Sequence, residues 1–225
     1  MSTPHTVTPS QPAYLLRTPR LLLRCLEPTD AARRKDAVDS SGEHLKRFFP
    51  PTEEGSMSLD LHAGQLRKAR ANFDLDLDRC YGAFEPDAGR MLGETCLFKR
   101  AGLQALEIGY WLRRDAVGQG LATEMSAAMV KAAFELDAVK RMDLFCDPDN
   151  ERSVAMARRL GFTLEGRLRD RQRAPHHERG DLLSFSLLAS EYPRSHASQL
   201  PLEAFDFLGR RMAPAGRLRD APAGI

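Results

Sequence analysis

The stretch VGQGLAT, residues 117–123, decides how the whole sequence is interpreted. An apolar run, EIGYWLRRDA, ends just before it, and an alanine-rich pattern with helical spacing follows it. Where a strand turns into a helix, backbone N–H groups and the positive end of the helix dipole point at one place, so an anion can bind there. Gly118 and Gly120 would let a phosphate approach the main chain without a Cβ in the way. Taken alone, however, such a glycine pair more often forms only a tight turn.

Two well-defined nucleotide-binding motifs do not fit this stretch. A P-loop needs Lys followed by Ser or Thr directly after its second glycine, and no such pair follows Gly120. The dinucleotide fingerprint needs a third glycine, where Thr123 stands, and it opens a parallel sheet. The strands before Gly118 are instead expected to form an antiparallel meander, so both motifs are excluded.

Hydrophobic periodicity along the chain predicts one main domain of the α+β class. The expected order is a strand, two or three helices, three strands, a helix, a strand, a short helix and two strands, at residues 20–28, 29–77, 80–114, 120–138, 140–148, 150–162 and 163–192. The strand after the helical crossover should run parallel to its neighbour. Shifts in composition set a flexible N-terminal arm at residues 1–15, the domain at 16–192 and a C-terminal tail at 193–225.

Composition argues against several classes of partner. The net charge of +2 lies on a well-mixed 28% of charged residues, without the basic block that follows nucleic acid. No apolar run approaches the roughly 20 residues that span a bilayer, and no signal peptide is recognisable, so a cytoplasmic protein without membrane partners is expected. The four cysteines lack CxxC or Cys/His spacing, which favours reduced thiols over a disulfide framework or a zinc site. These cysteines are Cys25, Cys80, Cys96 and Cys146.

The motifs around the glycine pair strengthen the ligand-binding interpretation. The segments EIGYWL, GQGLATE, NERSVAMARRLGF and TLEG follow one another, and TPRLLLRCLEPTDA opens the domain. This set resembles the GNAT superfamily of acetyl-CoA-dependent N-acetyltransferases, in particular the RimJ/RimL-type branch that acetylates ribosomal-protein N-termini. The resemblance covers residues 16–192. It implies the GNAT fold, with a mixed, mostly antiparallel central sheet flanked by helices.

The resemblance also implies where acetyl-CoA binds. The family's pyrophosphate loop, [Q/R]-x-x-G-x-[G/A], falls on residues 117–122, where Val117 replaces the usual Gln or Arg. Main-chain N–H groups are expected to hold the pyrophosphate without a metal, and a backbone N–H near the end of GYWL would hold the thioester carbonyl. Asn150 is expected to cap the following helix and to contact the pantetheine arm. The implied cofactor-binding set is Trp111, Leu112, Val117, Gly118, Gln119, Gly120, Leu121, Ala122, Thr123, Asn150 and Ser153.

Catalytic roles are less well marked in the sequence. The resemblance offers two glutamates as the base that deprotonates the acceptor, Glu107 and Glu165, and a bound water is a third alternative. Many relatives protonate the leaving thiolate with a tyrosine four residues before a Gly-Phe pair, but Ala157 stands there. Ser153 or a water would take that role.

Three functions remain open at this point. The first is an N-acetyltransferase whose acceptor is a protein or peptide N-terminal α-amine, which the RimJ/RimL-type resemblance favours. The second is an N-acetyltransferase that acts on a small-molecule amine, such as an antibiotic or a metabolite. The third is a GNAT-fold module that binds acyl-CoA without turnover, for which Val117 and Ala157 argue. A homodimer is open as the assembly.

Overall fold

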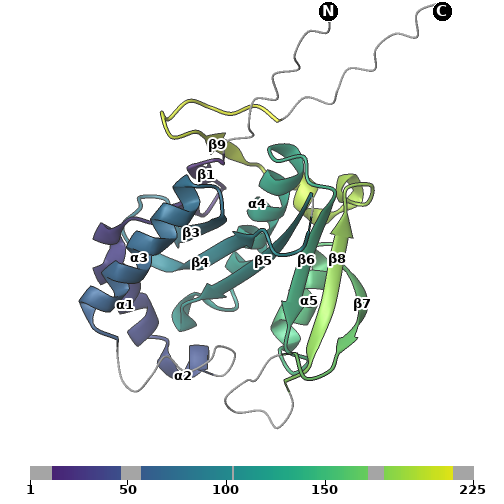
Figure 1. Cartoon of the computed structure of the whole chain (residues 1–225), viewed down its shortest axis with the longest axis horizontal. Helices are drawn as coiled ribbons and strands as arrows, with labels where there is room; N and C mark the ends of the chain where they lie inside the picture. The colour runs from purple at the N-terminus through teal and green to yellow at the C-terminus, as the bar shows by residue number, and fades with distance from the viewer. Residues whose placement is uncertain (1–11, 47–56, 103, 172–179, 215–225) are drawn as a thin grey trace, which may run out of the picture.

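The computed structural model describes residues 12–46, 57–102, 104–171 and 180–214, which form a mixed sheet with helices on both faces (Figure 1). The nine strands follow the order β7-β8-β6-β5-β4-β3-β2-β1-β9, and every neighbouring pair is antiparallel except β5 and β6. This confirms the expected fold class and the parallel crossover. The strands are β1 (Leu15–Arg17), β2 (Leu22–Cys25), β3 (Asp78–Phe84), β4 (Met91–Phe98), β5 (Ala105–Leu112), β6 (Arg141–Cys146), β7 (Thr163–Leu168), β8 (Leu182–Leu188) and β9 (Glu203–Phe205).

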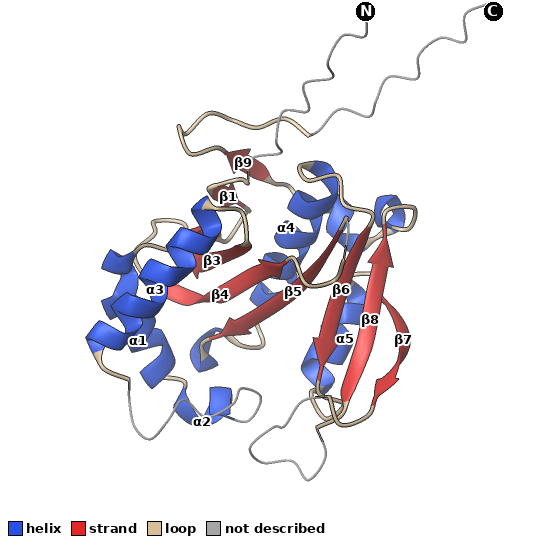
Figure 2. Cartoon of the chain, viewed as in Figure 1, coloured by secondary structure: helices blue, strands red, loops and turns tan. Residues whose placement is uncertain are grey.

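The helices separate into two groups by the face they cover. The described helices are η1 (Pro28–Asp30), α1 (Ala31–Asp39), α2 (Gly42–Lys46), α3 (Leu59–Asp74), η2 (Arg114–Ala116), α4 (Leu121–Glu135), α5 (Glu151–Arg159), η3 (Tyr192–Arg194) and η4 (His196–Gln199). Figure 2 shows α4 and α5 behind the central strands, with α1 and α3 at the other side of the sheet. Met125 and Met129 of α4 are fully buried in the larger hydrophobic core, while Leu66 of α3 belongs to a smaller second cluster.

The C-terminal segment belongs to the same sheet, in contrast to the predicted tail. β9 pairs antiparallel with β1, with Leu16 opposite Ala204, and η4 packs on α4. At the other end of the chain, Ala13 is buried and the Tyr14 N–H donates to Phe205 O over 2.8 Å. The described parts of the predicted arm and tail therefore complete one edge of the sheet. Composition missed this because β1 and β9 are three residues each.

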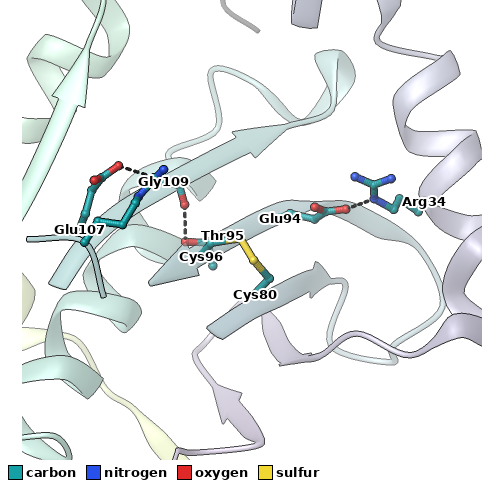
Figure 3. The surroundings of a disulfide bond; sticks show 8 residues. Arg34, Cys80, Glu94, Thr95, Cys96, Glu107 and Gly109 are labelled. Carbon is teal, nitrogen blue, oxygen red and sulfur yellow. Dashed lines mark hydrogen bonds and ion pairs between the residues drawn. A yellow bond between two sulfur atoms is a disulfide. The ribbon is translucent and has the colours of Figure 1, made fainter. Parts of the chain in front are cut away.

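The structure also corrects the prediction that all cysteines are reduced thiols. Cys80 and Cys96 are opposite each other in the β3–β4 register and form a disulfide, with their Cα atoms 4.1 Å apart (Figure 3). Their sequence separation of 16 resembles no motif. Only the strand register brings them together, and the spacing of cysteines in the sequence does not show which residues of two strands are opposite each other. Cys25 and Cys146 are free and buried.

The described residues contain neither a helix that could span a membrane nor a cluster of metal-binding side chains. None of their helices is long and apolar enough to cross a membrane. Within the same ranges, no group of three or more His, Cys, Asp or Glu side chains is placed to hold a metal ion.

Candidate active site

The predicted anion-binding turn leads directly into α4. Gly118 and Gly120 both have left-handed backbones, with φ angles of 85° and 77°. Glycine adopts this conformation without the steric penalty that a Cβ brings. The first N–H groups of an α-helix have no intrahelical acceptor, so the amides of Leu121, Ala122 and Thr123 are available to a ligand. The partial positive charge of the helix end favours an anion at the same place.

The loop side chains leave this role to the main chain. Val117, at the first position of the predicted pyrophosphate loop, is partly buried and packs against the main hydrophobic core. Gln119 turns back and donates from Nε2 to the Asp115 carbonyl over 3.0 Å. Backbone amides are therefore the polar groups that this loop offers to a ligand.

A buried carboxylate, missed in the sequence, holds the loop in place. Glu124 on α4 is 8% exposed. It accepts hydrogen bonds from Thr18 Oγ1 at 2.6 Å, from the Arg20 backbone N–H at 2.9 Å and from Arg20 Nε at 2.6 Å. The same guanidinium donates from Nη1 to the Gln119 carbonyl over 2.8 Å. The turn between β1 and β2 thus fixes the glycine loop although Arg20 and Gln119 are 99 residues apart.

A hollow of about 350 Å³ opens beside the loop. Its walls include Gly120 and Thr123 at the start of α4, together with the basic side chains of Arg20 and Arg159. His196 of η4 completes this group, so the C-terminal segment forms part of the wall. The hollow therefore lies at the start of α4 beside two guanidinium groups that attract anions, and Glu124, the carboxylate paired with Arg20, also lines it.

The parallel strands β5 and β6 separate close to the same end of the sheet. Their pairing runs only from Ala105 with Arg141 to Ile108 with Leu144, whereas β5 continues to Leu112. Figure 1 shows the two strands diverging. We call this gap the β5–β6 opening.

The hydrogen-bond pattern decides which amide of β5 faces the opening. The Arg113 N–H donates to the Leu92 carbonyl on β4 over 2.8 Å. Amides of a strand alternate between its two neighbours, so the Trp111 N–H also points to β4 and the Leu112 N–H points to the opening. Of the two residues predicted to supply a backbone donor, the structure directs Leu112 toward the gap.

A pair of hydroxyl groups lies on the face of the sheet covered by α5, at the part of β5 that borders the β5–β6 opening. Asn150 caps α5 as predicted, because its Oδ1 accepts from the Ser153 N–H over 3.2 Å. Ser153 Oγ lies 2.8 Å from the hydroxyl of Tyr110 on β5. Burial raises the pKa of Tyr110 to about 12, so the phenol is protonated at neutral pH. The sequence did not point to Tyr110, because the family pattern places the tyrosine on α5. At that position this chain has Ala157, which is buried in the core.

The two predicted glutamates lie elsewhere, along the paired part of β5 and β6. Glu107 is opposite Asp143 and forms an ion pair with Arg100 over 2.7 Å, and burial raises its pKa. Four residues, or about 13 Å of extended strand, separate it from Trp111. Glu165 accepts two hydrogen bonds from Arg141, at 2.8 and 2.7 Å, and these lower its pKa to about 2. A carboxylate with so low a pKa accepts a proton poorly.

Comparison with known proteins identifies a matching family profile and several similar proteins. The profile of the Acetyltransferase (GNAT) domain matches residues 20–163. A Bacillus subtilis (strain 168) protein named "Putative ribosomal N-acetyltransferase YdaF" is 28% identical over 181 residues, which make up 76% of this chain and 93% of that protein. The ribosomal protein uS5-alanine N-acetyltransferase of Escherichia coli (strain K12) is 26% identical over 161 residues, 71% of this chain and 83% of that protein.

Solved structures show the same fold. Mycobacterium smegmatis RimJ in complex with CoA-disulfide superimposes with a TM-score of 0.74 over 84% of this chain and 94% of that chain, at 24% identity. The match to the GNAT domain extends over more than half of this chain. It includes the glycine turn before α4 and both strands of the β5–β6 opening. The chain belongs to the GNAT acetyltransferase family.

Proposed function

We propose that this chain transfers the acetyl group of acetyl-CoA to the N-terminal α-amine of a protein or peptide. The observation that carries the proposal is the pair of left-handed glycines, Gly118 and Gly120, directly before the available amides of α4. This turn lies after β5, the strand that forms one side of the β5–β6 opening. An anion-binding turn next to a backbone donor in a gap suits a long ligand with phosphates at one end and a carbonyl at the other.

The proposed placement of acetyl-CoA uses both parts of the site. Its pyrophosphate would accept hydrogen bonds from the main chain of residues 117–123. Its adenosine end carries a 3′-phosphate, and the hollow beside Gly120 offers Arg20, Arg159 and His196 to it. The pantetheine arm would pass the start of α5, where Asn150 and Ser153 lie, to bring the thioester to the opening.

The proposed chemistry needs a polarised carbonyl and a proton for the leaving group. The Leu112 N–H would donate to the thioester oxygen as negative charge develops there. The amine nitrogen forms a bond to the carbonyl carbon and loses a proton to solvent as the amide forms, the C–S bond breaks, and the thiolate takes a proton. The Tyr110 and Ser153 hydroxyls, 2.8 Å apart, would supply that proton and regain it from solvent. Tyr110 thereby removes one argument for a module without turnover, the absence of a tyrosine at position 157.

The acceptor class rests on the names of the relatives. The name of one Escherichia coli relative says that it acetylates an alanine of ribosomal protein uS5. A second Escherichia coli protein, the ribosomal-protein-serine acetyltransferase, is 36% identical over 63 residues, 28% of this chain and 35% of that protein. These names support a protein N-terminus over a small-molecule amine for this chain.

Thermal stabilisation and thiol release together test the proposal. Acetyl-CoA should raise the melting temperature, and free thiol should appear only when an amine is added. The amine panel contains a peptide with a free N-terminus, its N-terminally blocked counterpart and aminoglycoside-like small amines. Thiol release with the free peptide alone supports the proposal, while stabilisation without release on any amine would identify a binding module. No stabilisation by any CoA ester would reject the acetyl-CoA site itself.

A further inference from the structure

A third carboxylate, Glu94 on β4, lies level with the β5–β6 opening and was missed in the sequence. It is opposite Trp111 in the β4–β5 register, and the two side chains share one face of the sheet. This is the face that α1 and α3 cover, opposite to the face of Tyr110 and Ser153. Glu94 is thus separated from the proposed thiol-protonating pair by the sheet itself.

A network of helix side chains orients Glu94. Arg34 of α1 donates from Nε to Glu94 Oε1. The Nη1 of the same guanidinium donates to Gln65 Oε1 over 2.7 Å and lies 2.9 Å from His62 Nδ1. Since a guanidinium is only a donor, His62 Nδ1 must be the acceptor, and the imidazole is neutral with its proton on Nε2. That Nε2 is buried and has no partner among the described residues.

The hydrogen bonds leave one oxygen of Glu94 available. Only Oε1 is bonded to Arg34, and Oε2 has no hydrogen-bond partner among the described residues. The side chain is 11% exposed, and Oε2 is not among the buried, unpartnered polar atoms of the described residues, so this oxygen keeps contact with solvent. A carboxylate held by one oxygen and open at the other can accept a hydrogen bond from a cationic donor.

Position distinguishes Glu94 from the two glutamates predicted earlier. Figure 3 shows Glu94 directed at Arg34 and Glu107 at the other end of the two strands. By register, Glu107 is opposite Phe98, four residues along β4 from Glu94. Glu165 is bound to Arg141 at the first residue of β6, about 17 Å of strand before Cys146. Only Glu94 of these three lies beside the residues that line the opening.

We propose that Glu94 binds the ammonium group of the acceptor and takes its proton, with Arg34 as its positioning residue. This rests on the proposed function, and it deepens it by assigning the acceptor side of the site. One proton passes from the ammonium nitrogen to Glu94 Oε2. The freed lone pair then forms the N–C bond to the thioester carbon as the C–S bond breaks. The nitrogen loses its second proton to solvent to become the neutral amide, and Glu94 returns its own proton to solvent. Of the charged or titratable groups around Glu94, Arg34 from α1 is bonded to it and His62 from α3 contacts that arginine, while β3 and β5 present Gly82 and Trp111 opposite Glu94.

The test is Glu94→Gln, which removes the charge and keeps the shape. kcat/KM for the peptide amine should fall by about 100-fold, the lower range for loss of a general base, while acetyl-CoA Kd should change less than about twofold. Asp137→Asn is the matched control. It breaks another buried arginine–carboxylate pair, Arg79 Nη1 to Asp137 at 2.6 Å, with both side chains below 10% exposure. Its kcat/KM should stay near that of the unmodified chain.

A second pair of measurements separates catalysis from folding. Arg34→Gln should raise KM for the peptide more than it lowers kcat, because Glu94 remains in place but loses the donor that orients it. If Glu94→Gln does not fold, the Arg34→Gln/Glu94→Gln double variant removes both charges together and should show the same loss of kcat. Unchanged kcat/KM in the glutamine variants, with normal turnover by the unmodified chain, would overturn this inference alone. Absence of turnover by the unmodified chain on every amine would instead overturn the proposed function on which it rests.

Discussion

Replacing Gly120 by Ala separates backbone strain from ligand binding at the proposed pyrophosphate site. Gly120 has a φ of 77°, and an added Cβ would lie 3.5 Å from Arg20 Nη2, an ordinary contact. The protein without ligand therefore accommodates the methyl group, and the left-handed backbone is the main penalty. That penalty is about 1 kcal/mol in the free energy of unfolding, or about 2–4 °C in melting temperature for a chain of this size.

The effect on acetyl-CoA binding should be larger than the effect on stability. Gly120 lines the hollow beside the loop, so the new methyl group would occupy space that a phosphate needs to reach the helix amides. Loss of one hydrogen bond to a charged phosphate corresponds to about 1.5–3 kcal/mol. The dissociation constant for acetyl-CoA should therefore rise by about 10- to 100-fold.

Isothermal titration calorimetry with acetyl-CoA, together with thermal unfolding, measures both quantities. Gly209→Ala is the matched control because Gly209 has a similar φ of 73°, with no heavy atom within 4 Å of an added Cβ. It should show the same loss of stability and unchanged affinity. If Gly120→Ala binds acetyl-CoA as tightly as Gly209→Ala does, the main-chain cradle at residues 117–123 is refuted.

Three further predictions address other parts of the molecule. Tyr110→Phe should lower kcat by about 10-fold or more if the phenol protonates the thiolate. The loss in kcat should disappear with an acyl donor whose thiol is more acidic. An equal loss in kcat with both donors would argue against this role. Arg159→Ala should weaken CoA binding by about fivefold but leave dephospho-CoA nearly unaffected in calorimetry, and equal weakening of both ligands would remove the 3′-phosphate from the hollow. Reducing the Cys80–Cys96 disulfide, which closes a loop of 16 residues, should lower the urea-unfolding free energy by about 2–3 kcal/mol; a Cys80→Ser/Cys96→Ser variant as stable as the oxidised chain would contradict the bond.

Local patterns in the sequence predicted the elements that local forces determine. α4 follows from its alanine-rich apolar face, and the glycine turn follows from Gly118 and Gly120, which lie between β5 and that helix. Asn150 as a cap is likewise readable from adjacent residues. The loop proposed to bind pyrophosphate could be predicted because residues 117–123 form one continuous segment.

The acceptor side and the supports of the loop depend on pairs distant in sequence. Arg20 and Glu124 are 104 residues apart, Arg34 and Glu94 are 60 apart, and Tyr110 and Ser153 are 43 apart. No periodicity or motif links such residues, since strand register and helix packing bring them together. The family resemblance did not identify these pairs either, because the glutamates that it implies are Glu107 and Glu165.

The most direct test of the proposed activity uses two peptides of identical sequence, one with a free N-terminus and one blocked, each containing a lysine. Both are incubated with acetyl-CoA and the full chain, and released thiol is measured alongside the acetylated site by tandem mass spectrometry. We expect equal amounts of thiol and of peptide acetylated at the α-amine for the free peptide, and neither product for the blocked one. Acetylation of the lysine in both peptides, or thiol release without any acetylated peptide, would contradict the proposed activity.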